Sequence, residues 1–322
     1  PDAVALAAQL TALKAPAREI ARAFRRWCEA QARRRPVLLV LDDLHWAEPT
    51  FLDLVEQLVA RGRGSIFVLA LAREELLEER PRFLYSGAER IVLEALSPRE
   101  TETLLDDLAG VALPADDRAR ILEAAEGIPL FVEQLVALVA EGGLGPERPL
   151  PTSIRALLSA RLDRLGPGER AVLERAAVVG RTFREGDLAP LLEPKSAATA
   201  PRHLHTLADR GFVRAGPDGA WRFRHVLIQE AVIRATPKEV RAALHERFGD
   251  WLDEPDELVG YHLEQAHRLR VELALVDRRT QQLGEDAGER LARGGMRAWK
   301  RTDAPAAVNL LGRATSLLGE RD

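Results

Sequence analysis

One stretch of the sequence, residues 36–48, constrains the fold of this chain more than any other. It reads Pro-Val-Leu-Leu-Val-Leu-Asp-Asp-Leu-His-Trp-Ala-Glu, so an apolar run leads directly into two adjacent carboxylates, Asp42 and Asp43. A continuous apolar run without alternation is typical of a strand buried on both faces, as in a parallel sheet. Open α/β sheets bind ligands in the crevice outside the carboxyl ends of their strands. The two acids are therefore candidate site residues.

Aliphatic residues followed by Asp-Asp also form the pattern of a Walker B strand. In such a strand the first acid, here Asp42, holds Mg²⁺ as the metal ligand. The second acid, here Asp43, is the catalytic residue that orients the attacking water. The alternative is a buried strand that ends in a solvated turn. The longer string Leu-Asp-Asp-Leu-His-Trp-Ala-Glu favours the first interpretation.

This string resembles the Walker B segment of signal-transduction ATPases of the STAND class. It is similar to that of the large bacterial LuxR-type regulators and of the Orc1-like AAA ATPase modules attached to some nucleotide cyclases. The resemblance implies a P-loop core that binds ATP or ADP with Mg²⁺. Residues 65–72 predict a second buried strand, and the resemblance also implies that Arg73, at the end of this strand, senses the γ-phosphate. An ordinary arginine at a strand end, paired with Glu74 or Glu75, is the alternative.

The phosphate-binding loop of such an ATPase does not occur in this sequence. There is no G-x-x-x-x-G-K-[ST] motif, the Walker A loop whose backbone cradles the phosphates. We therefore expect the chain to be a piece of a longer protein. ATP hydrolysis is expected only of a full-length protein that carries the loop.

A second motif lies at residues 127–135 and reads Gly-Ile-Pro-Leu-Phe-Val-Glu-Gln-Leu. We expect Gly127 to end one helix and Pro129 to begin the next, with its φ preset. The motif is similar to the Gly-x-Pro-Leu-x-Val element of STAND lid domains, and this resemblance implies that Pro129 contacts the adenine. The alternative is a turn between helices that needs Gly and Pro for its geometry alone. Both can hold at once.

A third feature is the junction at His225. The turn over residues 216–219 and the alternating stretch 221–225 predict a β-hairpin, and helices followed by a hairpin indicate a winged helix. Related nucleotide switches, among them plant disease-resistance proteins and apoptosome-forming ATPases, have a His-Asp pair at this junction, and its His contacts the β-phosphate of ADP. His225 matches that His, whereas Val226 stands in place of the Asp. A histidine satisfied within the fold is an equally weighted alternative.

These features predict a multidomain α/β plus α fold. A helix is expected over residues 4–32 and a short third strand at residues 90–93. The predicted domains are the C-terminal half of a P-loop NTPase parallel-sheet core, a helical lid, a winged helix, and an α-helical region leading into tetratricopeptide-like (TPR-like) repeats: 1–96, 97–150, 151–226 and 227–322.

Composition restricts the cellular location and the partners. A single cysteine, Cys28, excludes a disulfide framework, and there is neither a signal peptide nor an apolar run of membrane-spanning length. A cytoplasmic protein without a membrane partner is expected. The net charge is −4, but residues 151–226 hold 13 basic against 8 acidic residues, a local charge of +5.

Two classes of function fit these observations. The first is an ATP/ADP-binding regulatory switch of a signal-transduction ATPase, part of a bacterial transcriptional regulator or a cyclase-linked regulator. Its helical repeats would bind a protein partner, and a separate effector domain could reach DNA. The second is a module without nucleotide chemistry, either an interaction scaffold or a winged helix that binds DNA. The basic residues for DNA contact would be Arg202, Arg210, Arg214, Arg222 and Arg224.

Overall fold

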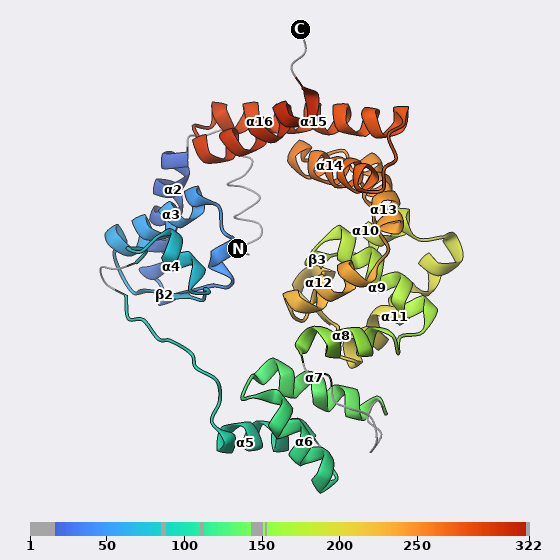
Figure 1. The fold of residues 1–322 in the computed structure, drawn as a ribbon. Coiled ribbons are helices and arrows are strands. Elements are labelled where there is room, and N and C mark those ends of the chain that lie inside the picture. Colours follow the sequence, from blue (N-terminus) through green and yellow to red (C-terminus); the bar gives the residue numbers. More distant parts are fainter. Residues whose placement is uncertain (1–16, 85–87, 110–112, 143–150, 152, 320–322) are drawn as a thin grey trace. The chain divides into compact units, whose positions relative to one another are not determined.

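The structure, a computed structural model, describes residues 17–84, 88–109, 113–142, 151 and 153–319 (Figure 1). Most of these residues are helical, and two small sheets complete the described fold, so the predicted α/β plus α class is confirmed. The chain divides into two compact units. The first holds the described residues up to Ile91, with Glu254–Tyr261 and the residues from Gly284 on; the second holds Val92–Asp253 and His262–Leu283.

The first unit begins with a helix and continues as strand, helix, strand around the two acids. Its elements are α2 (Ala17–Ala32), β1 (Val37–Leu41), the 3-10 helix η1 (Leu44–Trp46), α3 (Pro49–Arg61), β2 (Ile66–Ala70) and α4 (Glu75–Glu79). The part of the expected helix over 4–32 that precedes residue 17 lies outside the described residues. β1 and β2 pair in parallel, with Val37 opposite Ile66 and Leu41 opposite Ala70. Proline at the first position of α3 suits a helix start, where its missing N–H costs nothing.

One face of this strand pair is exposed, so the prediction of a strand buried on both faces is wrong. Exposure alternates along both strands. The exposed fractions on the open face are 62% for Leu38, 56% for Val40, 64% for Phe67 and 43% for Leu69. The opposite face packs on a core that includes Leu44, Leu52, Val55, Leu76 and Phe83. The sequence run is apolar on both faces, but the described residues cover only one.

Residues 88–97 form neither a helix nor a strand, so the predicted third strand at residues 90–93 is also wrong. Ile91, Val92 and Leu93 are 76%, 63% and 85% exposed. Apolar β-branched residues favour a strand when a neighbouring strand and a buried face are present. No described strand pairs with this stretch, and no described core covers it.

The second unit begins with three helices, α5 (Pro98–Ala109), α6 (Ala115–Ala125) and α7 (Pro129–Ala140). Ser97 and Glu100 form the start of α5: the Glu100 carboxylate accepts hydrogen bonds from the Ser97 N–H at 2.8 Å and from the Ser97 hydroxyl at 2.6 Å. The three helices, together with Leu157 of the next helix, enclose an apolar core. Its buried members are Leu105, Ile121, Ala125, Phe131, Val132, Leu135, Leu138 and Leu157.

The next segment combines helices with a three-stranded sheet. Its elements are α8 (Ile154–Leu162), α9 (Pro167–Val179), β3 (Thr182–Phe183), α10 (Glu185–Leu188), the 3-10 helix η2 (Ala189–Leu191), α11 (Pro194–Asp209), β4 (Val213–Ala215), the 3-10 turn η3 (Pro217–Gly219) and β5 (Trp221–Phe223). The sheet is antiparallel in the order β3-β5-β4, and the predicted hairpin is present as β4 and β5. α11 starts at Pro194 and continues through Pro201.

All the remaining described elements are helices, as predicted. They are α12 (Val226–Ala235), α13 (Lys238–Trp251), α14 (Asp256–Glu272), α15 (Arg278–Lys300) and α16 (Ala304–Leu318). α15 and α16 approach closely, because a Cβ on Gly288 would lie 2.6 Å from Leu318 Cγ, and one on Gly295 would lie 2.7 Å from Leu311 Cγ. Within the described ranges, no helix has both the length and the apolar character needed to cross a membrane.

Candidate functional site

The two acids and Arg73 lie at the same edge of the β1–β2 pair. β1 ends at Leu41 and β2 ends at Ala70, and these two residues are partners across the parallel ladder. Parallel strands bring their carboxyl ends to one edge, and the Leu71 N–H extends the pairing by donating to the Leu41 carbonyl at 2.8 Å. Asp42 and Arg73 are exposed at this edge, and Asp43 is partly buried.

The backbone at Asp43 is left-handed, with φ 56° and ψ 40°. Such a conformation is uncommon outside glycine and costs an L-residue about 1–3 kcal/mol, although Asp tolerates it better than most. It turns the chain out of β1 so that the next residue, Leu44, is buried and begins η1. Strained conformations of this kind concentrate at ligand sites, and here one lies at the second acid.

His45 lies in the same loop as the two acids, and the Walker B pattern assigns it no role. Both of its ring nitrogens are buried, and neither has a hydrogen-bond partner among the described residues. Its ring lies 5.2 Å from that of Trp46, which is 67% exposed. A buried polar group without a partner is costly, so the environment of His45 is incomplete in the part of the chain described. Its place in the sequence, two residues after Asp43, was the only available signal.

The Gly127–Pro129 turn has the predicted geometry. Gly127 has φ 72°, and a Cβ there would lie 2.3 Å from the Leu96 carbonyl oxygen, so no other residue fits without a shift. The Leu96 N–H donates to the Gly127 carbonyl at 2.8 Å. Pro129 is the first residue of α7 and is exposed. The geometry of the turn is sufficient to explain the presence of Gly127 and Pro129. The exposed Pro129 ring is also accessible to a ligand.

His225 is the N-cap of α12. Its Nδ1 accepts a hydrogen bond from the Leu227 N–H at 3.1 Å, which satisfies one of the N–H groups that a helix start leaves without a partner. Since Nδ1 accepts, the proton of the neutral imidazole lies on Nε2. The ring therefore caps α12, and its Nε2 carries the N–H.

The elements that carry Pro129 and His225 meet within the second unit. Glu133 lies one turn after Pro129 on α7, and its carboxylate is 3.8 Å from the guanidinium of Arg224, the residue before His225. This ion pair thus joins the helix that Pro129 begins to the residue that precedes His225. It separately brings Asp42, Asp43 and Arg73 to one sheet edge.

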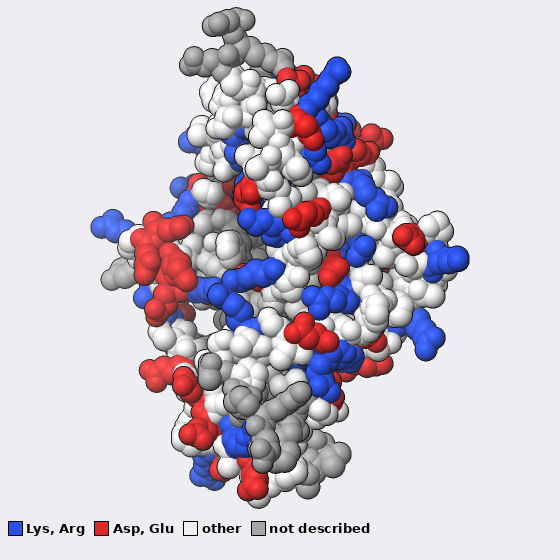
Figure 2. Space-filling view, turned by 45° about the vertical axis from the view of Figure 1, so that its right-hand side comes forward, with Lys and Arg blue, Asp and Glu red and all other residues white. Residues whose placement is uncertain are grey.

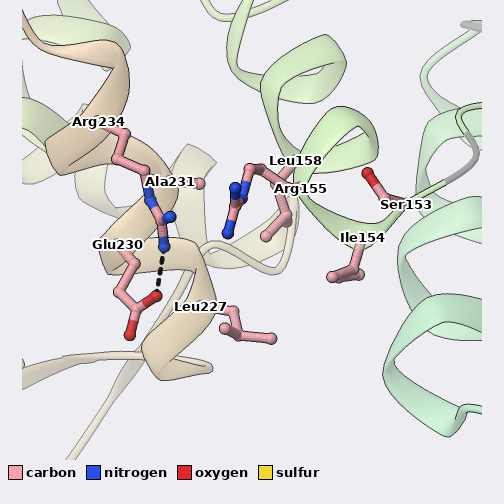
Figure 3. Close-up of a pocket in the computed structure, with 8 residues that line it drawn as sticks. All are labelled: Ser153, Ile154, Arg155, Leu158, Leu227, Glu230, Ala231 and Arg234. Atoms are coloured by element: carbon pink, nitrogen blue, oxygen red, sulfur yellow. Dashed lines mark hydrogen bonds and ion pairs between the residues drawn. The ribbon is translucent and has the colours of Figure 1, made fainter.

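A cavity of about 300 Å³ lies between α8 and α12, next to the helix that His225 caps (Figure 3). Ile154, Leu158, Leu227 and Ala231 give it an apolar lining. Its rim carries Arg155 and the pair Glu230–Arg234, whose charged groups are 2.6 Å apart. Since that pair is internally neutral, Arg155 supplies the net charge of the rim.

The described residues alone do not form a metal centre, because no three His, Cys, Asp or Glu side chains among them gather in a way that could hold an ion. This does not conflict with Mg²⁺ at Asp42. Magnesium in nucleotide sites is bound by one or two carboxylates, and phosphates and water supply its other ligands. Carboxylate oxygens at the end of β1 suit that ion by chemistry.

Some of the arginines proposed for DNA contact form ion pairs with acidic residues of the protein itself. Arg210 is only 21% exposed and pairs with Glu141 at 3.4 Å and with Glu169 at 3.0 Å. On the molecular face shown in Figure 2, basic and acidic side chains are interspersed. Binding to phosphates needs a basic stripe, so these contacts weaken the DNA interpretation.

Comparison with known proteins gives one relative of undetermined function. The chain is 31% identical over 252 residues to "Uncharacterized protein R02095" of Rhizobium meliloti (strain 1021). The match covers 70% of this chain and 23% of that protein, so the chain spans less than a quarter of the relative's length. No family model matches the chain. No solved structure matches it significantly.

Proposed function

We propose that this chain is the regulatory switch module of a STAND-class signal-transduction ATPase, in which bound ATP or ADP sets the conformation. The observation that carries the proposal is the sheet edge where Asp42 and Asp43 follow one strand and Arg73 follows its parallel neighbour. In P-loop ATPases the same edge holds Mg²⁺, the attacking water and the γ-phosphate.

In this proposal each residue has a distinct role. Asp42 holds Mg²⁺, Asp43 orients the attacking water, and Arg73 senses the γ-phosphate. Pro129 contacts the adenine, and His225 donates from Nε2 to the β-phosphate of ADP. The contact of Glu133 with Arg224 supports the last two assignments, because it associates the elements that carry them.

Finer features of the fold support the same proposal. The parallel pair with α3 between its strands suits part of a P-loop core, and α5–α7 suit a helical lid. The order of α9, β3, α10, α11 and the β4–β5 hairpin suits a winged helix. The close pair α15–α16 suits the start of a TPR-like array that binds a protein partner. A transcriptional or cyclase-linked regulator acting in the cytoplasm belongs to the same proposal.

The test compares this chain with a full-length protein that includes a phosphate-binding loop. The chain alone should not hydrolyse ATP above a buffer blank, because positioning of the phosphates is nearly all of phosphoryl-transfer catalysis. The full-length protein should bind Mg²⁺-ATP and Mg²⁺-ADP and hydrolyse ATP. Failure of the full-length protein to bind either nucleotide contradicts the proposal and leaves an interaction scaffold.

A further inference from the structure

The cavity between α8 and α12 has an apolar floor (Figure 3). Leu158 of α8 and Ala231 of α12 are 1% and 6% exposed, and both belong to the buried core that also contains residues of the β3-β5-β4 sheet. Ile154 and Leu227 are partly buried and pack against the same core. Both helices lie within the second unit. The floor is therefore the outer surface of a packed core, and it offers apolar contact to a ligand.

The cavity is open beside a small side chain. Leu227, Ala231 and Arg234 lie along one face of α12, because residues three and four apart are neighbours on a helix. Leu227 and Arg234 are long, whereas Ala231 ends at its Cβ and lines a space of about 300 Å³. A water takes up about 30 Å³ of the liquid, so this space suits a ligand of roughly ten non-hydrogen atoms.

The rim of the cavity is cationic. Figure 3 shows Arg155 and Arg234 extending from α8 and α12 toward the gap between these helices. Glu230 neutralises Arg234, since their charged groups are 2.6 Å apart. The Arg155 side chain is exposed, and within the described ranges it has no ion pair or hydrogen bond. Two guanidinium groups against one carboxylate leave the rim a net charge of +1 beside an apolar floor.

We propose that this cavity is a binding site for a small amphiphilic anion, an organic carboxylate with an unbranched apolar chain. The chain lies on Leu158 and Ala231, and the carboxylate accepts hydrogen bonds from the Arg155 guanidinium, whose planar fork matches a carboxylate. A single negative charge on the ligand balances the net charge of the rim. The site uses no residue of the β1–β2 edge, and its existence does not depend on the proposed nucleotide switch.

The test titrates octanoate into this chain, because the length and the charge of octanoate match the cavity. Methyl groups of Ile, Leu and Val are labelled and followed by nuclear magnetic resonance. The signals of Ile154, Leu158 and Leu227 should shift and saturate, with a dissociation constant of about 1 mM or lower for a ligand of this size. Leu38 and Val40, on the open face of the β1–β2 pair, report non-specific adsorption and should not saturate in the same range.

Substitutions test the charged and the apolar part of the site separately. Arg155→Met removes the charge but keeps an apolar stem, and it should weaken octanoate binding by about 10- to 100-fold. Ala231→Leu fills the cavity and should abolish the saturable shifts. Glu230→Gln leaves Arg234 without its counter-charge and should tighten binding by about two- to fivefold. The matched control is Arg202→Met, the same change at an exposed arginine outside the lining, which should bind octanoate like the unmodified chain.

The charge of the ligand gives a second criterion. Neutral 1-octanol should bind more weakly than octanoate, and octylammonium should bind most weakly of the three, because it meets the cationic rim. If Ala231→Leu does not fold, Arg155→Met decides, since the Arg155 side chain is exposed. The proposal is overturned if octanoate does not saturate the signals of Ile154, Leu158 and Leu227, if octylammonium binds as tightly, or if Arg155→Met leaves the dissociation constant unchanged.

Discussion

The two sheets of this protein differ in how completely they are covered. The β1–β2 pair has five-residue strands, yet one apolar face is open, with Leu38 and Phe67 more than 60% exposed. The β3-β5-β4 sheet has strands of only two or three residues, yet Phe183, Val213 and Phe223 are almost fully buried. Strand length therefore does not decide burial. The short sheet buries its large apolar residues on one covered face and exposes Thr182 and Arg214, whereas the longer strands carry large apolar residues on their open face as well.

The largest expected difference between the two sheets concerns stability. Phe223→Ala removes a fully buried ring whose centre lies 5.9 Å from that of the Phe183 ring, and it should lower the free energy of unfolding of its region by about 3–5 kcal/mol. Phe67→Ala removes a ring that is 64% exposed and should change it by less than about 0.5 kcal/mol. Hydrogen exchange at increasing denaturant concentrations measures the free energy of unfolding of each region separately. Equal losses would mean that the open face of β1–β2 is covered in solution.

The next effect concerns pH, and it should spare the β1–β2 region. His245 and His262 are buried with their Nδ1 atoms 2.9 Å apart, so one ring must donate and the other accept. Burial lowers the pKa of His245 to about 3, helped by His262, Arg241 and Arg268, and burial lowers that of His262 to about 4. Both values lie below the ordinary value of 6.5.

The unfolded chain therefore binds more protons than the folded chain below pH 6.5. Stability should be full above that pH and should fall as the pH drops towards about 4. By pH 5 the loss should be at most about 2 kcal/mol for each histidine, from 1.4 kcal/mol per pH unit. His262→Phe should reduce this pH dependence, whereas His205→Gln, at an exposed position, should not. A loss of protection in α13 and α14 at pH 5 that persists in His262→Phe would contradict this cause.

A smaller effect is expected at His225, where two substitutions separate the cap from the donor. His225→Ala removes the hydrogen bond to the Leu227 N–H and should cost about 1 kcal/mol locally. His225→Asn restores a cap acceptor but not the Nε2–H donor. Under the proposed switch, both variants of the full-length protein should release ADP faster. If only the alanine variant differs from wild type, in melting temperature alone, His225 serves α12 and nothing more.

The sequence was sufficient where local rules determine structure. Ser97 and Glu100 specify a helix start, Gly127 and Pro129 specify a turn, and alternation over residues 221–225 specifies a strand. The sequence failed where neighbours decide the outcome. Ile91–Leu93 read as a strand but have no partner strand, and the run before Asp42 is apolar on both faces although one is open.

The candidate site shows the same limit. The positions of Asp42 and Arg73 follow from a parallel ladder, which strand patterns can predict. The left-handed backbone at Asp43 and the burial of both His45 ring nitrogens depend on the turn and its surroundings. The cap role of His225 depends on where α12 begins, and no periodicity fixes that residue to better than a position or two. The buried Arg161 donates a hydrogen bond to the Arg210 carbonyl, and no local pattern could reveal a contact between residues so far apart in the chain.

Nucleotide binding to Walker B variants of the full-length protein tests the central claim most directly. Asp42→Asn should weaken Mg²⁺-nucleotide binding, because it removes a metal-ligand charge. Asp43→Asn should leave binding near normal and slow ATP hydrolysis. The matched control is Glu48→Gln, at an exposed acid in the same loop, which should behave like wild type. If Asp42→Asn and Asp43→Asn bind and hydrolyse as wild type does, the strand before them is not a Walker B strand and the proposed switch is wrong.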